Sequence, residues 1–167
     1  MSDTYLIERL GHQGDGIAAG PVFVPRALPG ERVGGTPEDG RIERPKILDP
    51  VPERVKVACP HYGGCGGCAV LHATDDFVAD WKTGVVRTAL EAQGISTLFR
   101  PILTSPPASR RRAVFAGRRL KKGALVGFHG RGSDQIQSVP DCLVIRPALA
   151  AALPLLERLV IETGSRK

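Results

Sequence analysis

Three of the four cysteines lie within one short glycine-rich segment, and their spacing restricts the local fold more than any other feature of the sequence. In the segment CPHYGGCGGC, residues 59–68, five residues separate Cys59 from Cys65 and two separate Cys65 from Cys68, while Cys142 lies far downstream. Thiolates at these spacings converge on one centre only if the backbone between them bends tightly, and glycines permit such bends. This cysteine segment therefore predicts a four-thiolate metal or iron–sulfur site held by Cys59, Cys65, Cys68 and Cys142.

Disulfides, inert core thiols and a zinc site remain open as alternative roles for the cysteines. Disulfides are disfavoured, because the N-terminal MSDTYLIERL lacks the pattern of a secretory signal and predicts a cytoplasmic protein in a reducing compartment. Inert core cysteines prefer apolar neighbours to pairs of glycines. Zinc is the stronger competitor, but zinc knuckles usually combine two CxxC pairs, and this chain has one. Ligand softness and spacing favour a [4Fe-4S] cluster over zinc.

The charge of the chain points to a polyanionic partner. Its 167 residues carry a formal net charge of +6, and the calculated pI is about 9.5. Such a balance favours nucleic acid over acidic proteins as the leading class of partner. No apolar run approaches the length of a membrane span, so we expect no membrane association, and no obligate protein partner is evident.

The overall pattern predicts an α+β fold that begins with a small β-barrel or sandwich. Short apolar runs alternate with glycine and proline turns, as is typical of small all-β modules. The strand candidates are residues 4–10, 17–19, 22–24, 31–33 and 41–48. A barrel of the OB type is attractive, because basic proteins use such modules on irregular or single-stranded nucleic acid. A purely structural β module is the alternative.

Helices and an antiparallel meander are expected after a proline-containing connector at residues 49–57. Thr74 is a plausible N-cap of a helix that ends before Gly94, and from Pro147 the chain again looks helical, with Pro154 as a kink or helix start. Further strand candidates are residues 98–103, 111–120, 124–129 and 135–139. The last three would form the meander, and ligation by Cys142 would then tie this sheet to the cysteine segment.

Basic side chains are concentrated in the first strand and the turns of the predicted meander. The candidate RNA-binding residues are Arg110, Arg111, Arg112, Arg118, Arg119, Lys121, Lys122 and Arg131. Arginine dominates this set, and its planar guanidinium suits phosphate and base-edge contacts. A strand face that is merely kept soluble by charge is the alternative, but few acids lie nearby in sequence to pair with these residues. We therefore expect contact with RNA.

Several segments resemble the front half of bacterial RNA (uracil-5-)-methyltransferases, most closely the 23S rRNA enzymes. They are ACPHYGGCGGCAVLH, the basic SRRRA segment, and VGFHGRGSDQIQSVPDCLVIRPAL. The N-terminal YLIERLGHQGDGIA and VFVPRALPGERV are similar to the family's TRAM domain, an OB-like RNA-binding barrel. The resemblance implies [4Fe-4S] ligation by Cys59, Cys65, Cys68 and Cys142, and ribosomal RNA as the partner. Leu71 departs from the glutamine that many members have there.

The family's chemistry belongs to a further domain that we do not find in this chain. That domain binds S-adenosylmethionine and supplies a cysteine that attacks C6 of uracil, whereas all four cysteines here are assigned to the cluster. The resemblance implies a TRAM domain at residues 1–50, an iron–sulfur and antiparallel-sheet domain at 51–146, and at 147–167 the helical start of a connection to the catalytic domain. We expect the full enzyme to be a methyltransferase and this chain alone to bind RNA without methylating it.

Two other functional classes remain as alternatives. A small iron–sulfur electron carrier would need no arginine-rich surface, so the basic residues argue against it. A stand-alone RNA-binding protein with a zinc or iron–sulfur site is closer to the pattern. Methyl transfer to an activated uracil needs no net redox step, so we expect the cluster to hold an RNA-binding surface together rather than to pass electrons.

Overall fold

The computed structural model describes residues 3–164, which form two compact units. The first contains the described residues up to Lys56 together with Ala69–Leu103. The second contains Val57–Cys68 and the described residues from Thr104 onward. The cysteine segment and Cys142 therefore belong to the same unit.

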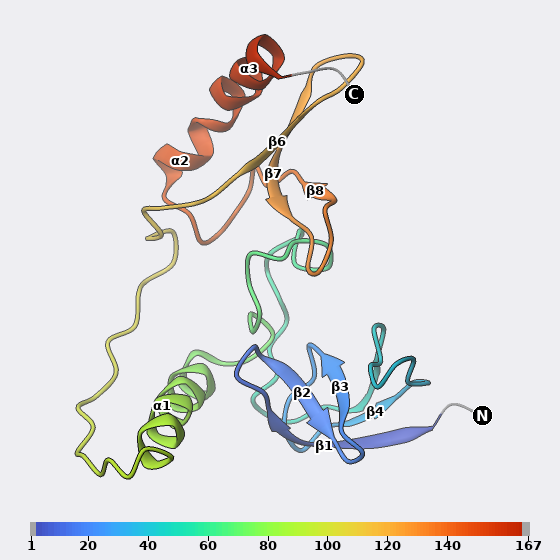
Figure 1. The fold of residues 1–167 in the computed structure, drawn as a ribbon, viewed down its shortest axis with the longest axis vertical. Helices are drawn as coiled ribbons and strands as arrows, with labels where there is room; N and C mark the ends of the chain where they lie inside the picture. The colour runs from blue at the N-terminus through green and yellow to red at the C-terminus, as the bar shows by residue number, and fades with distance from the viewer. Residues whose placement is uncertain (1–2, 165–167) are drawn as a thin grey trace. The chain divides into compact units, whose positions relative to one another are not determined.

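A five-stranded antiparallel sheet forms the N-terminal part of the first unit (Figure 1). Its strands follow the order β3-β2-β1-β4-β5. They are β1 (Thr4–Leu10), β2 (Asp15–Ala18), β3 (Val22–Pro25), β4 (Arg32–Gly34) and β5 (Lys46–Asp49). All five strand candidates at the N-terminal end of the sequence are thus confirmed, although the last begins at Lys46 rather than near residue 41.

The sheet curls toward closure because its β3 edge is hydrogen-bonded to the segment between β4 and β5. The Phe23 N–H donates to the Gly40 carbonyl at 2.8 Å, and the Ile42 N–H donates to the Phe23 carbonyl at 3.0 Å. Register shifts in the β1–β2 and β4–β5 pairs add local twist. The curled sheet encloses a small apolar core of Ile7, Ala18, Val22, Val24, Ala27, Val33 and Ile42. The predicted barrel-like sheet is confirmed at this level.

A buried ion pair fastens the segment after β5 to the sheet. Glu31 is completely buried and accepts hydrogen bonds from the Leu28 N–H at 2.8 Å and from Arg54 Nη2 at 2.7 Å. Arg54 also donates to the Arg26 carbonyl at 2.7 Å. Burial alone would raise the pKa of Glu31, but hydrogen bonds from Arg54 and Leu28 outweigh it and hold the pKa below its ordinary value.

Helix α1 (Asp75–Glu91) begins where its sequence predicts. The Thr74 hydroxyl accepts a hydrogen bond from the Phe77 N–H at 3.4 Å, and two acids occupy the first turn. The segment before the cap is also fixed, because the Val55 N–H donates to the His72 carbonyl at 3.0 Å and the Thr74 N–H to the Glu53 carbonyl at 2.9 Å. Gly94, at φ +71°, follows the end of the helix as expected.

The predicted strand at residues 98–103 is wrong, because the segment is irregular. Leu98 and Leu103 are 97% and 96% exposed, so their side chains contribute almost no burial to the unit. The alternation of apolar residues indicates a strand only where a partner strand completes the hydrogen bonds, and none pairs with this segment among residues 3–164.

The second unit is built on the expected antiparallel meander, with strand order β6-β7-β8. The strands are β6 (Ala116–Arg119), β7 (Ala124–His129) and β8 (Ile136–Gln137). The prediction that the first strand begins at residue 111 is wrong, because the chain just before it pairs elsewhere. The Arg110 N–H donates to the Val144 carbonyl and the Arg146 N–H donates to the Arg110 carbonyl, both at 3.0 Å.

Two helices complete the second unit. They are α2 (Pro147–Ala151) and α3 (Leu153–Thr163), and Pro154 lies in the first turn of α3, as predicted. Helix α3 packs on β6 and β7, where Gly117 leaves room for Val160. None of the helices in residues 3–164 is both long and apolar enough to cross a bilayer. The fold class is therefore α+β, with a barrel-like sheet and a separate meander.

Candidate cluster site and basic surface

Tight turns shape the cysteine segment. The His61 carbonyl accepts hydrogen bonds from the N–H groups of Gly64 at 3.1 Å and Cys65 at 2.8 Å, and the Tyr62 N–H donates to the Cys59 carbonyl at 3.4 Å. These contacts turn the backbone back on itself between the first two cysteines. The expected bending is therefore present.

The end of the cysteine segment lies against the turn that follows β7. Cys65 pairs with Gly130 in an isolated antiparallel bridge, and the Gly66 N–H donates to the His129 carbonyl at 2.9 Å. A methyl group on Gly66 would lie 2.9 Å from that carbonyl oxygen and 3.0 Å from the Arg131 nitrogen. This close approach to the backbone of residues 129–131 requires glycine at position 66.

Cys142 approaches the same region from the other end of the unit. Its neighbours pair with the segment before β6, since the Ala108 N–H donates to the Leu143 carbonyl at 2.9 Å. Arg110, in that segment, also donates from Nη1 to the Gly67 carbonyl at 3.4 Å. Arg110 therefore links the strand-like stretch after Cys142 to the cysteine segment.

The four thiols share one electrostatic neighbourhood. Burial raises the pKa of Cys68, Arg110 opposes that rise, and Cys142, Cys65 and Cys59 add to it. All four cysteines are half-buried and none is in a disulfide. The structure thus places all four cysteines in the second unit, while their role as ligands stays a prediction.

The residues present fit an iron–sulfur cluster in donor type. Four soft sulfur donors suit iron–sulfur or zinc chemistry rather than hard cations. The Gly67 N–H donates to Cys65 Sγ at 3.3 Å, and a methyl group on Gly67 would lie 3.3 Å from the same sulfur. The glycine thus keeps space open beside the Cys65 sulfur. Within residues 3–164, no group of three histidine, cysteine or acidic side chains is arranged to hold a single metal ion.

The predicted RNA-binding residues occupy different environments. Arg118 donates to the Asp134 carbonyl at 3.2 Å, whereas half-buried Arg119 donates to the Gly164 carbonyl at 3.0 Å. Arg131 is half-buried in the turn between β7 and β8. The other predicted residues are exposed, and they are Arg110, Arg111, Arg112, Lys121 and Lys122.

The two lysines lie together in the turn between β6 and β7. No hydrogen bond or ion pair with another residue of the described chain restrains the ammonium group of Lys121 or Lys122. Both groups are therefore available to an external anion.

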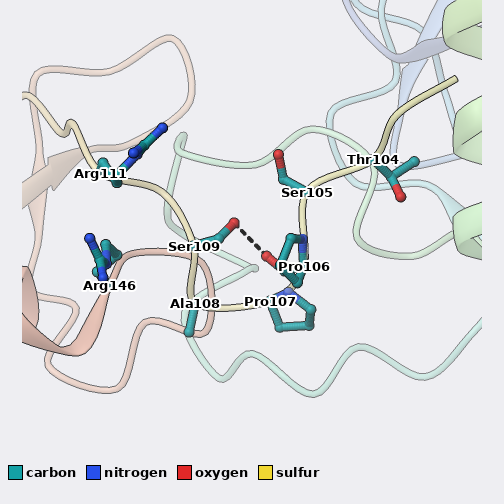
Figure 2. A pocket seen from close by; sticks show the side chains of 8 residues that line it. All are labelled: Thr104, Ser105, Pro106, Pro107, Ala108, Ser109, Arg111 and Arg146. Atoms are coloured by element: carbon teal, nitrogen blue, oxygen red, sulfur yellow. Dashed lines mark hydrogen bonds between the residues drawn. The ribbon is translucent and has the colours of Figure 1, made fainter.

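A pocket of about 540 Å³ lies within the second unit, lined by residues 104–109 together with Arg111 and Arg146. Figure 2 shows Arg111 and Arg146 on one side of Ser109, with Thr104 and Ser105 on the other. Arg146 was not among the predicted RNA-binding residues, because it follows the meander and stands apart from the arginine run. The sequence did hold one signal for Arg146. It is a basic residue four positions after Cys142, which was expected to tie the meander to the cysteine segment.

Comparisons with known proteins identify relatives of this chain. No family model matches it. It is 45% identical over 159 residues to an uncharacterized RNA methyltransferase of Caulobacter vibrioides, covering 92% of this chain and 38% of the relative. It is 35% identical over 158 residues to the 23S rRNA (uracil(1939)-C(5))-methyltransferase RlmD of Marinomonas posidonica, covering 87% of this chain and 35% of the relative.

A solved structure has the same fold at low sequence identity. It is the Pyrococcus abyssi tRNA (uracil-54, C5)-methyltransferase, solved with S-adenosyl-L-homocysteine. The match covers 95% of this chain and 37% of the Pyrococcus chain, with a TM-score of 0.62 and 20% sequence identity. The chain thus spans less than half the length of its relatives, between 35% and 41% for the curated ones. The chain is related over most of its length to the N-terminal part of RNA methyltransferases, a group that includes the 23S rRNA (uracil-C5) enzymes.

Proposed function

We propose that this chain is the RNA-recognition and cluster-bearing part of an S-adenosylmethionine-dependent 23S rRNA (uracil-5-)-methyltransferase. The observation that carries the proposal is the 45% identity to an RNA methyltransferase over 92% of the chain. The grouping of all four cysteines with the basic hairpin in one unit supports it. We also propose a cytoplasmic location and the division into residues 1–50, 51–146 and 147–167.

Cys59, Cys65, Cys68 and Cys142 would hold a [4Fe-4S] cluster. When bound, the cluster would supply a cross-link between the cysteine segment and the chain after β8, not a reaction step. The N–H of Gly67 would donate to one ligand sulfur, and the guanidinium of Arg110 would offset part of the negative charge of the thiolates. A hydrogen bond of 3.4 Å from Arg110 Nη1 to the Gly67 carbonyl supports this arrangement.

The curled sheet of the first unit would act as an OB-like TRAM module that contacts RNA. Its strand order and curl are compatible with such a barrel. The second unit would add phosphate contacts through the exposed basic residues Arg111, Arg112, Arg118, Lys121 and Lys122, with Arg110, Arg119 and Arg131 nearby. Together these elements would fix the RNA by shape and charge.

Methyl transfer itself would depend on the remaining part of the enzyme. With all four cysteines assigned to the cluster, this chain offers no thiolate for attack at C6 of uracil. A target uridine would have to leave its stack to reach a catalytic pocket, and this part would hold the surrounding RNA while that occurs. We expect no methylation by this chain when S-adenosylmethionine and RNA are supplied.

RNA binding tests the proposal directly. Affinity of the chain for a fluorescent 23S rRNA hairpin, measured by anisotropy, should fall steeply as potassium chloride rises, because phosphate contacts release counterions. Replacing Lys121 and Lys122 together with alanine should weaken binding roughly five- to tenfold, since both lysines lie exposed in one turn. The Arg158→Ala variant on the exposed face of α3 serves as the control.

The outcome also separates the substrate classes. Tighter binding to the rRNA hairpin than to a tRNA of equal length supports the ribosomal assignment, and the reverse order assigns the chain to a tRNA enzyme instead. Absence of salt-dependent binding to either RNA would overturn the recognition role.

A further inference from the structure

We infer that the pocket beside Ser109 is a binding site for one backbone phosphate of the RNA, held by Arg111 and Arg146. The inference rests on the proposed RNA-binding function and adds a specific site to it. Both arginines line the pocket, together with the hydroxyl-bearing Thr104, Ser105 and Ser109. Two guanidinium groups and several hydroxyls around one hollow form the donor set that a phosphodiester requires.

The charge balance of the pocket favours an anion. No acidic residue lines it, and no carboxylate pairs with the side chain of Arg111 or Arg146 in the part of the chain that the structure describes. Two positive guanidinium groups at one pocket, with no carboxylate beside them, raise the local positive potential there. Arg54, by contrast, is neutralised locally by Glu31. The two arginines at the pocket therefore attract a negative group from outside the described chain.

Backbone pairing builds the pocket and holds the two arginines at its edge. The Arg146 N–H donates to the Arg110 carbonyl at 3.0 Å, so Arg146 lies beside the residue that precedes Arg111. The Ala108 N–H donates to the Leu143 carbonyl at 2.9 Å, which fixes the loop on the other side. Residues far apart in sequence are thus brought to one place by the same strand-like pairing.

The loop that forms the pocket wall adopts a demanding conformation. Ala108 has φ +53°, in a region that residues with a side chain rarely adopt. The Ser109 hydroxyl donates to the Pro106 carbonyl at 2.6 Å and so closes the turn (Figure 2). That bond uses the Ser109 donor within the loop and leaves the two arginines as the main donors for a bound phosphate.

The phosphate is assigned to RNA rather than to a free anion because of where the pocket lies. Arg111 is continuous in sequence with exposed Arg112, and β6 with its basic turn follows a few residues later. A strand of RNA that contacts these side chains would carry phosphates at regular intervals along the same stretch. The pocket would then fix the register of the backbone, while the basic turn adds unspecific attraction.

Binding of the RNA hairpin by the full chain tests the inference with Arg111→Ala, Arg146→Ala, the double variant, and Arg158→Ala as a matched exposed control. Each single variant should weaken binding roughly five- to tenfold and reduce the slope of log affinity against log salt by about 0.7 to 0.9. The double variant should lose less than the product of the two single losses, because both arginines serve one phosphate. Arg158→Ala should bind as the wild type does.

Hairpins with single neutral methylphosphonate linkages identify the ligand group. One linkage should weaken binding to the wild type and have little effect on Arg146→Ala, because the variant has already lost that contact. Inorganic phosphate is the comparison probe. If the wild type binds inorganic phosphate but RNA affinity is insensitive to both arginines, the pocket is a small-anion site and the assignment to RNA is wrong.

Failure of the pocket site is distinguishable from failure of RNA recognition. If the wild-type chain shows no salt-dependent RNA binding, the recognition function itself is overturned. If the wild type binds RNA and Arg146→Ala binds it equally well with an unchanged salt slope, only the pocket inference is overturned. Circular dichroism of each variant excludes a loss of fold as the cause of weaker binding.

Discussion

Glu31 and Arg110 are charged residues whose roles depend on partners distant in sequence. Glu31 is completely buried and is stabilised as a carboxylate by Arg54 and by the Leu28 N–H. Arg110 is exposed, but one of its nitrogens donates to the Gly67 carbonyl and its charge acts on Cys68. Sequence position alone indicated surface charge for the arginine and gave no signal for the ion pair.

Replacing Glu31 with glutamine should destabilise the first unit at neutral pH by about 2–4 kcal/mol, because Arg54 loses its charged partner. Urea unfolding followed by the fluorescence of Trp81, the single tryptophan, measures the change within this unit. Glu8→Gln, at an exposed position on β1, should leave the free energy of unfolding nearly unchanged.

The same ion pair predicts how stability depends on pH. The pKa of Glu31 is lower in the folded state than its ordinary value of 4.5, so its contribution is complete above that value. It is lost as the pH falls from about 4.5 through the lower folded pKa. The Glu31→Gln variant should therefore show a smaller loss of stability between pH 6 and pH 3, and an acid dependence equal to that of the wild type would contradict the assignment.

Arg110 should support the cluster more than it supports RNA binding. Its replacement with alanine removes the hydrogen bond to Gly67 and the positive charge near Cys68, and should weaken retention of the cluster roughly tenfold. The rate of cluster loss is measured from the fall in visible absorption during exposure to air or a chelator. Arg112→Ala, at an exposed neighbouring position, is the matched control. Equal rates for the two variants would assign Arg110 to the RNA surface alone.

At the scale of the elements, local patterns were reliable wherever hydrogen-bond partners lay nearby in sequence. The cap at Thr74, the meander turns and the position of Pro154 follow from short motifs, and the structure confirms them. The start of β6 was misplaced because Arg110 pairs with the chain around Ile145. The segment 98–103 was misassigned because apolar alternation carries no information about whether a partner strand exists.

Two glycines of the cysteine segment provide a matched test of how that segment is held. Gly66→Ala would place a methyl group against the backbone of residues 129–131 and should destabilise the second unit by about 1–3 kcal/mol while lowering cluster content. A methyl group on Gly63 would meet nothing within 4 Å, so Gly63→Ala should change the free energy of unfolding by less than about 0.5 kcal/mol. Thermal unfolding and iron content measure both effects.

A difference between the two glycine variants is the expected result. If Gly66→Ala retains wild-type iron content and stability, the close approach of the cysteine segment to the turn after β7 does not hold the site together. If Gly63→Ala also loses iron, the segment is sensitive to any added side chain rather than to this contact.

At the scale of the whole molecule, the sequence indicated the fold class, the set of cysteines and the resemblance to RNA methyltransferases. It did not indicate the pocket, because Arg146 and Arg111 reach the same pocket only through pairing of the segments on either side of the meander. Nor could it show that Arg119 is engaged by the Gly164 carbonyl while the lysines of the neighbouring turn are exposed. Long-range pairing determined each of these features, and composition and spacing describe only local order.

The proposed function depends above all on four cysteines from two distant segments holding one iron–sulfur cluster beside the RNA-recognition surface. Iron, acid-labile sulfide and zinc content of the anaerobically purified chain should therefore be compared with those of Cys142→Ser. We expect about four irons and four sulfides per wild-type chain, with a visible band that Cys142→Ser largely loses. A colourless wild-type protein without iron and sulfide, or a Cys142→Ser variant with the iron content of the wild type, would contradict the cluster assignment.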